Sequence, residues 1–238
     1  MTENYPVRAS TEKMAGHAIV PIPTLTGRVH LVEGESGSVL VDALTTRFSR
    51  TVLNAVRQRE DGQPGRVKLI LISHAHIDHF GGALRLREEL GAPIAIHELD
   101  ADDLRRGRNG ALYCRNLRES LLKFSVSRMK SQPIEPDIVL RGEEGDLREW
   151  GIEAKWVRTP GHTEGSISVV FPGEMAIVGD LVIGRFGVSR KPAYPFWVRD
   201  AGQLRQSIRR VLDLSPRVFL SGHGGPFRAE DVKRVFLG

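Results

Sequence analysis

The chain has 238 residues, of which 40% are hydrophobic and 26% charged, enough for one α/β domain with a large core. Its single cysteine excludes an internal disulfide bond and a cysteine-based zinc site. The formal net charge is +5, but the arginines are scattered along expected helices without interleaved aromatic residues, which argues against a nucleic-acid partner.

No run of about 18 apolar residues occurs, so the sequence predicts no transmembrane helix and no membrane partner. The first residues lack a basic segment followed by an apolar one, which argues against secretion and favours a cytoplasmic protein. We expect residues 1–238 to form one domain with a helical insertion at about 98–130. A homo-oligomer stays open, because the sequence does not indicate an oligomeric state.

Apolar runs and glycine-containing breaks predict four strands in the first part of the chain, at residues 17–22, 29–33, 39–41 and 67–72. Helical spacing of apolar residues predicts helices over 51–60 and 80–90. Gly91 and Pro93 end the second of these helices. The pattern therefore alternates strands and helices, as an α/β fold requires.

Three histidines and an aspartate follow the fourth strand within six residues: His74, His76, Asp78 and His79. Imidazole and carboxylate are both zinc ligands, and imidazole also binds iron, nickel and copper. Residues i and i+2 of an extended segment share one side, so His74 and His76 can hold one ion together. Asp78 and His79 lie where the chain turns into a helix, so they can serve a second ion.

Residues 98–130 interrupt the regular alternation, between strands expected at 94–96 and 138–140. Helices are expected over 99–106 and 111–124, with Cys114 on the second. Such an insertion can line the entrance to a substrate site or can serve as a lid or oligomer contact. Both interpretations stay open.

Three later strands each end next to another metal-ligand residue. His162 follows a strand and a Pro-Gly turn, Asp180 ends an apolar run, and His223 follows a strand at residues 218–220. Glycines beside His223 let the backbone come close to whatever this histidine contacts. With the earlier motif the set contains five histidines and two aspartates, which suits two adjacent ions if one carboxylate bridges them.

The loop at residues 183–198 follows Asp180 and contains several aromatic residues. Exposed aromatic side chains beside a metal centre favour an apolar substrate wall. Phe196 and Trp197 can equally pack against a helix expected over 203–212. A last helix is expected over 229–236.

These motifs, in this order, resemble those of the metallo-β-lactamase superfamily, and the resemblance spans nearly the whole chain. It rests on Asp42 in V-D-A, the H-x-H-x-D-H run at 74–79, His162 in T-P-G-H-T, Asp180 in G-D and His223 in S-G-H-G-G. The resemblance implies an α/β fold of the four-layer αββα-sandwich type.

The resemblance also implies a ligand set for two ions. His74, His76 and His162 would hold one metal. Asp78, His79 and His223 would hold the other, with Asp180 bridging. Asp42 would orient an imidazole through its other ring nitrogen. Two zinc ions per chain are expected, with iron or manganese as alternatives. The remaining histidines are expected to be structural: His17, His30 and His97.

The expected function is metal-dependent hydrolysis, in which metal-bound hydroxide attacks a small thioester, lactone or related acyl substrate. Asp180 would steady the ions, and Asp78 would carry a proton to the leaving group. The motif resembles that of glyoxalase II-like thioesterases, whose helical C-terminal extension this chain lacks. It also resembles that of quorum-signal lactonases, in which Tyr commonly stands at the position of Ile183. The alternatives are a mononuclear iron persulfide dioxygenase and a phosphodiesterase or nuclease of the same superfamily.

Overall fold

The structure is a computed structural model that describes residues 11–14, 16–59 and 65–238, without the side chains of residues 13, 14 and 118. Seven strands follow one another across the first sheet: β1 (Glu12–Met14), β2 (His17–Pro23), β3 (Arg28–Glu33), β4 (Ser38–Val41), β5 (Val67–Leu71), β6 (Ile94–His97) and β7 (Ile138–Leu140). Neighbouring strands from β1 to β4 pair antiparallel, and those from β4 to β7 pair parallel.

The second sheet contains six strands from the second half of the chain: β8 (Glu144–Asp146), β9 (Lys155–Arg158), β10 (Ile167–Phe171), β11 (Met175–Ile177), β14 (Val218–Leu220) and β15 (Phe227–Arg228). Their order across the sheet is β15-β14-β11-β10-β9-β8. Because β10 is antiparallel to both β9 and β11, and β11 is parallel to β14, the strands β9, β11 and β14 end at the same edge. A separate pair consists of β12 (Ile183–Gly184) and β13 (Pro192–Ala193).

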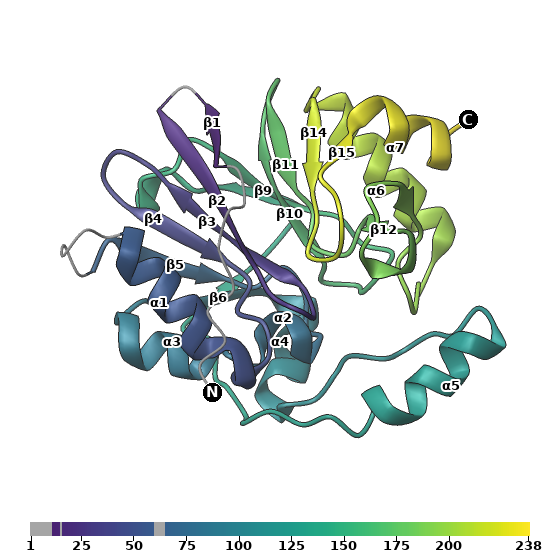
Figure 1. Ribbon diagram of the computed structural model, residues 1–238, viewed down its shortest axis with the longest axis horizontal. Helices are drawn as coiled ribbons and strands as arrows, with labels where there is room; N and C mark the ends of the chain where they lie inside the picture. The colour runs from purple at the N-terminus through teal and green to yellow at the C-terminus, as the bar shows by residue number, and fades with distance from the viewer. Residues whose placement is uncertain (1–10, 15, 60–64) are drawn as a thin grey trace.

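Helices cover the outer faces of the two sheets (Figure 1). The helices span α1 (Ser49–Arg59), α2 (Ile77–Phe80), α3 (Ala83–Leu90), α4 (Glu98–Arg106), α5 (Leu117–Val126), α6 (Ala201–Asp213) and α7 (Ala229–Phe236). In Figure 1, α1 and α3 lie outside the first sheet, α6 and α7 lie outside the second, and α5 projects from the body on long connections. Within the described residues, every helix is too short or too polar to cross a membrane.

Strand alternation builds an apolar layer on each face of the first sheet. In β5, Leu69 and Leu71 belong to the cluster between the two sheets, which also contains Phe171 of β10. Ile70 belongs to the cluster beneath the helices, together with Val52 of α1. A third apolar cluster joins the second sheet to α6 and α7. The predicted α/β fold, a four-layer αββα sandwich, is therefore confirmed.

The helix expected over residues 80–90 is divided into α2 and α3, with Gly81 and Gly82 between them. The N–H of Gly82 donates to the carbonyl oxygen of Leu44 at 2.8 Å, so it does not continue the helix. A Cβ atom at Gly82 would lie 2.5 Å from the carbonyl oxygen of Ala43, so this approach needs glycine. The helix beside the motif is therefore a single turn.

The helix expected over residues 111–124 begins later, at Leu117. The side-chain oxygen of Asn116 accepts a hydrogen bond from the N–H of Glu119 at 2.9 Å, which caps α5. Asn followed three residues later by Glu is a helix-start pattern, whereas apolar spacing alone extends the prediction too far. Cys114 consequently lies in the loop before α5 and not on a helix.

Candidate metal centre

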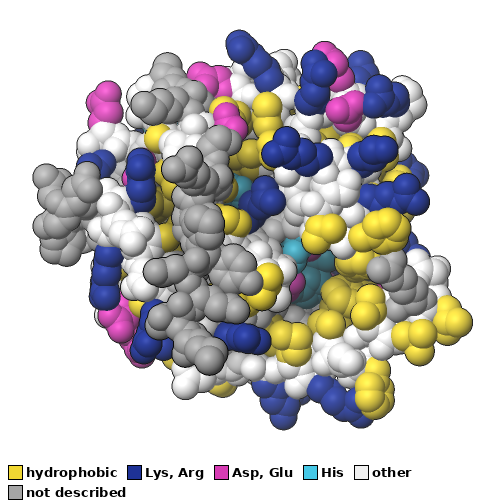
Figure 2. All heavy atoms as spheres, in the orientation of Figure 1, with side chains coloured by type: hydrophobic (Ala, Val, Ile, Leu, Met, Phe, Trp, Pro, Cys, Tyr) yellow, Lys and Arg dark blue, Asp and Glu magenta, His cyan; other side chains and the backbone are white. Residues whose placement is uncertain are grey.

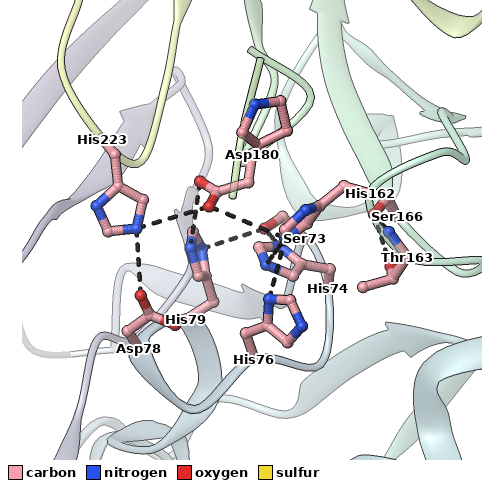
Figure 3. A network of polar contacts seen from close by, with 12 residues as sticks. Ser73, His74, His76, Asp78, His79, His162, Thr163, Ser166, Asp180 and His223 are labelled. Atoms are coloured by element: carbon pink, nitrogen blue, oxygen red, sulfur yellow. Dashed lines mark hydrogen bonds and ion pairs between the residues drawn. The ribbon is translucent and has the colours of Figure 1, made fainter. Parts of the chain in front are cut away.

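Four strand ends bring the seven predicted ligand residues together (Figure 3). The segment after β5 carries four of them: His74, His76, Asp78 and His79. The segments after β9, β11 and β14 carry His162, Asp180 and His223, respectively. Since these three strands end at one edge of the second sheet, their loops face the segment that leaves β5.

Three buried imidazoles form the first cluster. Nε2 of His162 lies 3.1 Å from Nε2 of His74 and 3.0 Å from Nδ1 of His76. Burial lowers the pKa of His162 to about 3, and it also lowers the pKa values of His74 and His76. Neutral imidazole is the form that binds a metal, so this cluster is prepared to receive a cation.

Carboxylates join imidazoles in the second cluster. Oδ2 of Asp78 lies 3.2 Å from Nε2 of His223, and Oδ1 of Asp180 lies 3.4 Å from Nε2 of His79. Oδ2 of Asp180 lies 3.7 Å from Nε2 of His223 and 3.9 Å from Nε2 of His162. Asp180 is thus the residue that adjoins both clusters.

The pKa values of the second cluster are shifted by the opposite charges of its members. Burial would lower the pKa of His79, but Asp42 and Asp180 raise it well above its ordinary value. Burial would also lower the pKa of His223, but Asp180 and Asp78 raise it above its ordinary value. Burial would raise the pKa of Asp78, but the hydrogen bond with His223 and the charge of His79 lower it. A divalent cation can replace these protons as the counter-charge of the carboxylates.

The donor atoms fit a divalent metal. In each of three groups, the ligand atoms all lie within 4.8 Å of one another: His74, His76 and His162; His74, His79 and Asp180; and Asp78, His79 and His223. Nε2 of His79 and Oδ1 of Asp180 are buried, and apart from their own 3.4 Å ion pair neither has a hydrogen-bond partner of normal geometry. Leaving such an atom unpaired costs about 1–3 kcal/mol, a cost that a bound cation would remove. Nitrogen and oxygen donors of this kind suit zinc and other first-row metals.

Asp42 contacts one imidazole of the second cluster directly and one of the first cluster through Ser73. Its Oδ2 lies 2.8 Å from Nδ1 of His79, which directs Nε2 of that ring toward Asp180. Asp42 also accepts hydrogen bonds from the N–H and Oγ of Ser73, at 2.8 and 2.9 Å, and this Oγ lies 3.0 Å from Nδ1 of His74. The backbone of Asp42 has a φ of 68°, a left-handed conformation that aspartate tolerates better than most residues. This carboxylate therefore orients two imidazoles on the side away from the candidate metal.

Asp100 is a further supporting residue that the sequence does not indicate. Its buried carboxylate accepts hydrogen bonds from the N–H of Ala75, the N–H of Gly165 and Oγ1 of Thr163, each at 2.8 Å. It therefore ties the loop after β5 to the loop that presents His162. An acidic residue in the first turn of a helix is common for reasons of helix electrostatics, so its type and position give no signal of this role.

The glycine before His223 has the close contact expected from the sequence. A Cβ atom at Gly222 would lie 2.6 Å from Cε1 of His79 and 3.2 Å from Oδ1 of Asp180. We expect Gly222→Ala to displace these side chains and to weaken metal binding about 10–100-fold, the loss typical when a residue that positions a metal ligand is replaced. Competition with a chromophoric chelator measures the affinity. In the control Gly202→Ala, the added methyl group meets only the Asp200 side chain, and unchanged affinity in both variants would contradict the prediction.

A cavity of about 390 Å³ opens above the second cluster, and Asp78, Asp180 and His223 line it. Its wall also contains hydrophobic side chains: Leu25, Phe186, Val188, Phe196 and Trp197. Figure 2 shows histidine at the bottom of a hollow with hydrophobic side chains around it. Phe196 and Trp197 thus lie in the cavity wall, as one of the two interpretations of this loop expected, while Tyr194 packs against Phe236 of α7, with ring centroids 4.6 Å apart.

The helical insertion contacts this wall. Nε1 of Trp197 donates to the carbonyl oxygen of Glu119 at 3.3 Å, and the Arg115 side chain donates to the carbonyl oxygen of Pro195 at 2.6 Å. The ring of Trp197 lies 6.3 Å from that of His76. The loop before α5 and its first turn are therefore held beside the cavity.

The three remaining histidines belong to none of these donor groups. His97 is buried, and its Nδ1 accepts from the N–H of Leu99 while Nε2 lies 3.0 Å from the carbonyl oxygen of Gly142. Nε2 of His17 accepts from the N–H of Glu153 at 3.0 Å. His30 is buried, and burial lowers its pKa to about 3.

An αββα sandwich with histidine and aspartate donors at its strand ends is the architecture of a metal-binding protein. Residues 23–223 match the family model of the metallo-beta-lactamase superfamily. The chain belongs to this superfamily, which confirms the resemblance seen in its motifs.

Relatives and solved structures agree with this membership. The chain is 27% identical over 214 residues to the probable metallo-hydrolase YflN of Bacillus subtilis, covering 82% of this chain and 78% of that protein. It is 26% identical over 208 residues to a hydroxyacylglutathione hydrolase of Cereibacter sphaeroides, covering 86% of this chain and 66% of that protein. A metallo-beta-lactamase with a HARLDQ motif from Cronobacter sakazakii matches with a TM-score of 0.63 at 21% identity, covering 88% of this chain and 75% of its own, a likeness of fold.

Proposed function

We propose that the protein is a metal-dependent hydrolase that binds two zinc ions and cleaves a small acyl thioester, ester or lactone. The observation that carries the proposal is the pair of adjoining donor clusters that share Asp180 at the bottom of an open cavity. Two divalent ions held side by side supply Lewis acids that polarise a carbonyl group and activate water at neutral pH.

The proposed ligand roles follow the two clusters. His74, His76 and His162 would hold one ion as neutral imidazoles. Asp78, His79 and His223 would hold the other, with Asp180 between the two. Asp42 keeps His79 oriented through the 2.8 Å contact to Nδ1, which leaves Nε2 of that ring for the ion.

Asp78 is the candidate for proton transfer. Its carboxylate lines the cavity, and its side chain is 37% exposed, more than any other residue of the two clusters. Because its carboxylate reaches the cavity, Oδ of Asp78 would be placed to pass a proton from the attacking water to the leaving group. Asp180 would stay ionised throughout and hold the ions together.

The acyl substrate class is supported by the relatives. One of them is named a hydroxyacylglutathione hydrolase, and another a probable metallo-hydrolase. The cavity also suits an acyl group, because hydrophobic side chains line it next to the ligands.

The test is metal analysis of protein purified without added ions, together with assays on a panel of thioesters, esters and lactones. We expect about two divalent ions per chain and hydrolysis of at least one acyl class, which a chelator abolishes and zinc restores. One iron per chain with oxygen consumption on glutathione persulfide would replace the proposal by an iron dioxygenase. Cleavage of phosphodiesters alone would replace it by a nuclease-type activity.

A further inference from the structure

A cationic side chain stands in the wall of the cavity that contains the metal ligands. Arg28, the first residue of β3, lines this cavity together with Asp78, Asp180 and His223. Its N–H donates to the carbonyl oxygen of Gly222 at 2.9 Å, which fixes its backbone beside the loop that presents His223. A molecule in the cavity can therefore contact the ligand cluster and this guanidinium group at once.

Arg28 has no ion-pair partner in the part of the chain that the structure describes. Burial and the charge of Arg190 both lower the pKa of Arg28. Neither Arg28 nor Arg190 forms an ion pair with a described carboxylate. Two like charges without an anion between them are unfavourable, and a bound anion would relieve this repulsion.

Several other arginines of the described chain do pair with a carboxylate. Arg158 and Arg210 both bind Glu143, at 2.7 and 2.8 Å. Arg115 binds the buried carboxylate of Glu119 at 2.7 Å. Arg28 differs from these three arginines, since no described carboxylate pairs with it at the position where a substrate would lie.

Three hydrophobic side chains of the cavity wall are open to solvent. Leu25 is 69% exposed, Phe186 is 60% exposed and Val188 is 78% exposed. These residues come from the turn between β2 and β3 and from the loop between β12 and β13, and all three line the cavity with Arg28. An occupant that matches this wall combines an apolar chain with one anionic group.

We infer that Arg28 binds a carboxylate of the substrate, so that the substrate is an anionic acyl thioester or ester whose apolar chain contacts Leu25, Phe186 and Val188. This inference rests on the proposed hydrolase function and deepens it. Arginine suits the task because its planar guanidinium group can donate two parallel hydrogen bonds to one carboxylate. Arg28 would thus be a specificity-determining residue, with Arg190 adding to the positive potential.

The experiment compares three thioesters of similar length. One is the propanethiol thioester of hexanoate, which is neutral. The second is the propanethiol monothioester of adipate, with a carboxylate on the acyl side. The third is the hexanoyl thioester of 3-mercaptopropionate, with a carboxylate on the leaving group. In wild-type protein we expect kcat/KM to be higher for one of the anionic thioesters than for the neutral one. The preferred thioester shows whether Arg28 binds a carboxylate on the acyl part or on the leaving group.

Arg28→Met removes the charge and keeps an apolar stem. We expect it to lower kcat/KM for the preferred anionic thioester at least about tenfold, mainly through KM, while the neutral thioester changes less than about twofold. Arg28→Lys keeps the positive charge but not the planar guanidinium group, so its kcat/KM for the anionic thioester should lie between those of wild-type protein and Arg28→Met. Arg209→Met, an exposed position on α6, is the matched control and should leave all three substrates unchanged.

Binding of adipate, measured by calorimetry on the zinc-loaded protein, gives a readout separate from turnover. We expect Arg28→Met to weaken adipate binding at least about tenfold, and added salt to weaken the binding to wild-type protein more than the binding to the variant. Equal losses on the neutral and anionic thioesters, or unchanged adipate binding, would overturn the inference. If wild-type protein cleaves none of the thioesters but Arg28→Met still loses adipate, the proposed hydrolysis fails while the carboxylate site stands.

Discussion

Replacement of Asp180 by asparagine is expected to lower turnover of the true substrate at least about a thousandfold. Asp180 is the carboxylate that adjoins both clusters, with Oδ1 near His79 and Oδ2 near His162 and His223. The amide would keep the shape but remove the negative charge and one of the two acceptor oxygens. Metals contribute several kcal/mol to such reactions, and each ~1.4 kcal/mol corresponds to a factor of ten.

Metal analysis of the same variant separates the roles of the two clusters. The three imidazoles of the first cluster are untouched by the change, so Asp180→Asn should retain close to one ion per chain after dialysis. The other ion should be lost at lower chelator concentration than in wild-type protein. Asp213→Asn, which removes an exposed carboxylate at the end of α6, is the control and should retain both activity and metal. Full activity of Asp180→Asn would show that the bridging role is wrong.

The convergence of the candidate ligands was predictable because it depends on a simple property of sheets. Strands that run in one direction end at one edge, so His162, Asp180 and His223 share that edge once β9, β11 and β14 are parallel in direction. The H-x-H-x-D-H run is short enough that local geometry alone brings its members together. Side-chain type and strand position together therefore sufficed to predict that these candidate residues lie close together, whereas the assignment of ligands to ions came from the resemblance and stays a prediction.

The supporting residues were less accessible to sequence reasoning, because their role depends on contacts between distant segments. Asp100 acts across 25 residues on Ala75 and across 63 residues on Thr163. Arg28 lines the cavity because the backbone at the start of β3 is hydrogen-bonded to Gly222. An ordinary acidic residue in a helix and an arginine at a strand start carry no pattern that distinguishes them from surface residues.

Two predicted helix boundaries were wrong, and in both cases the residues responsible can be seen in the local sequence. Glycines 81 and 82 divide one expected helix, since the chain there must approach the Ala43 carbonyl closely. With Asn116 as its cap, α5 begins at Leu117, six residues after the start at residue 111 that the apolar spacing suggests. Apolar periodicity locates a helix but does not give its ends, which depend on caps and breaks.

Replacement of Asp100 by alanine is expected to lower the free energy of unfolding by about 3–4 kcal/mol, a large effect for a residue that binds no metal. The change would leave the N–H groups of Ala75 and Gly165 and the hydroxyl of Thr163 buried without their acceptor. Each hydrogen bond to a charged group contributes about 1.5–3 kcal/mol, and part of this loss would be recovered when water enters. Urea unfolding of the metal-free protein measures the change.

The same substitution should also loosen the first cluster, because Asp100 joins the backbone between His74 and His76 to the residue after His162. We expect a 10–100-fold loss of metal affinity at that cluster, as for other groups that position ligands. Asp102→Ala is a matched control on the same helix. Its exposed carboxylate pairs with Arg105 at 2.9 Å, and an exposed pair of this kind is worth less than about 1 kcal/mol. If Asp100→Ala proved no more destabilising than Asp102→Ala, the two ligand loops would have to be held together by packing alone, and the buried carboxylate would have no part in shaping the centre.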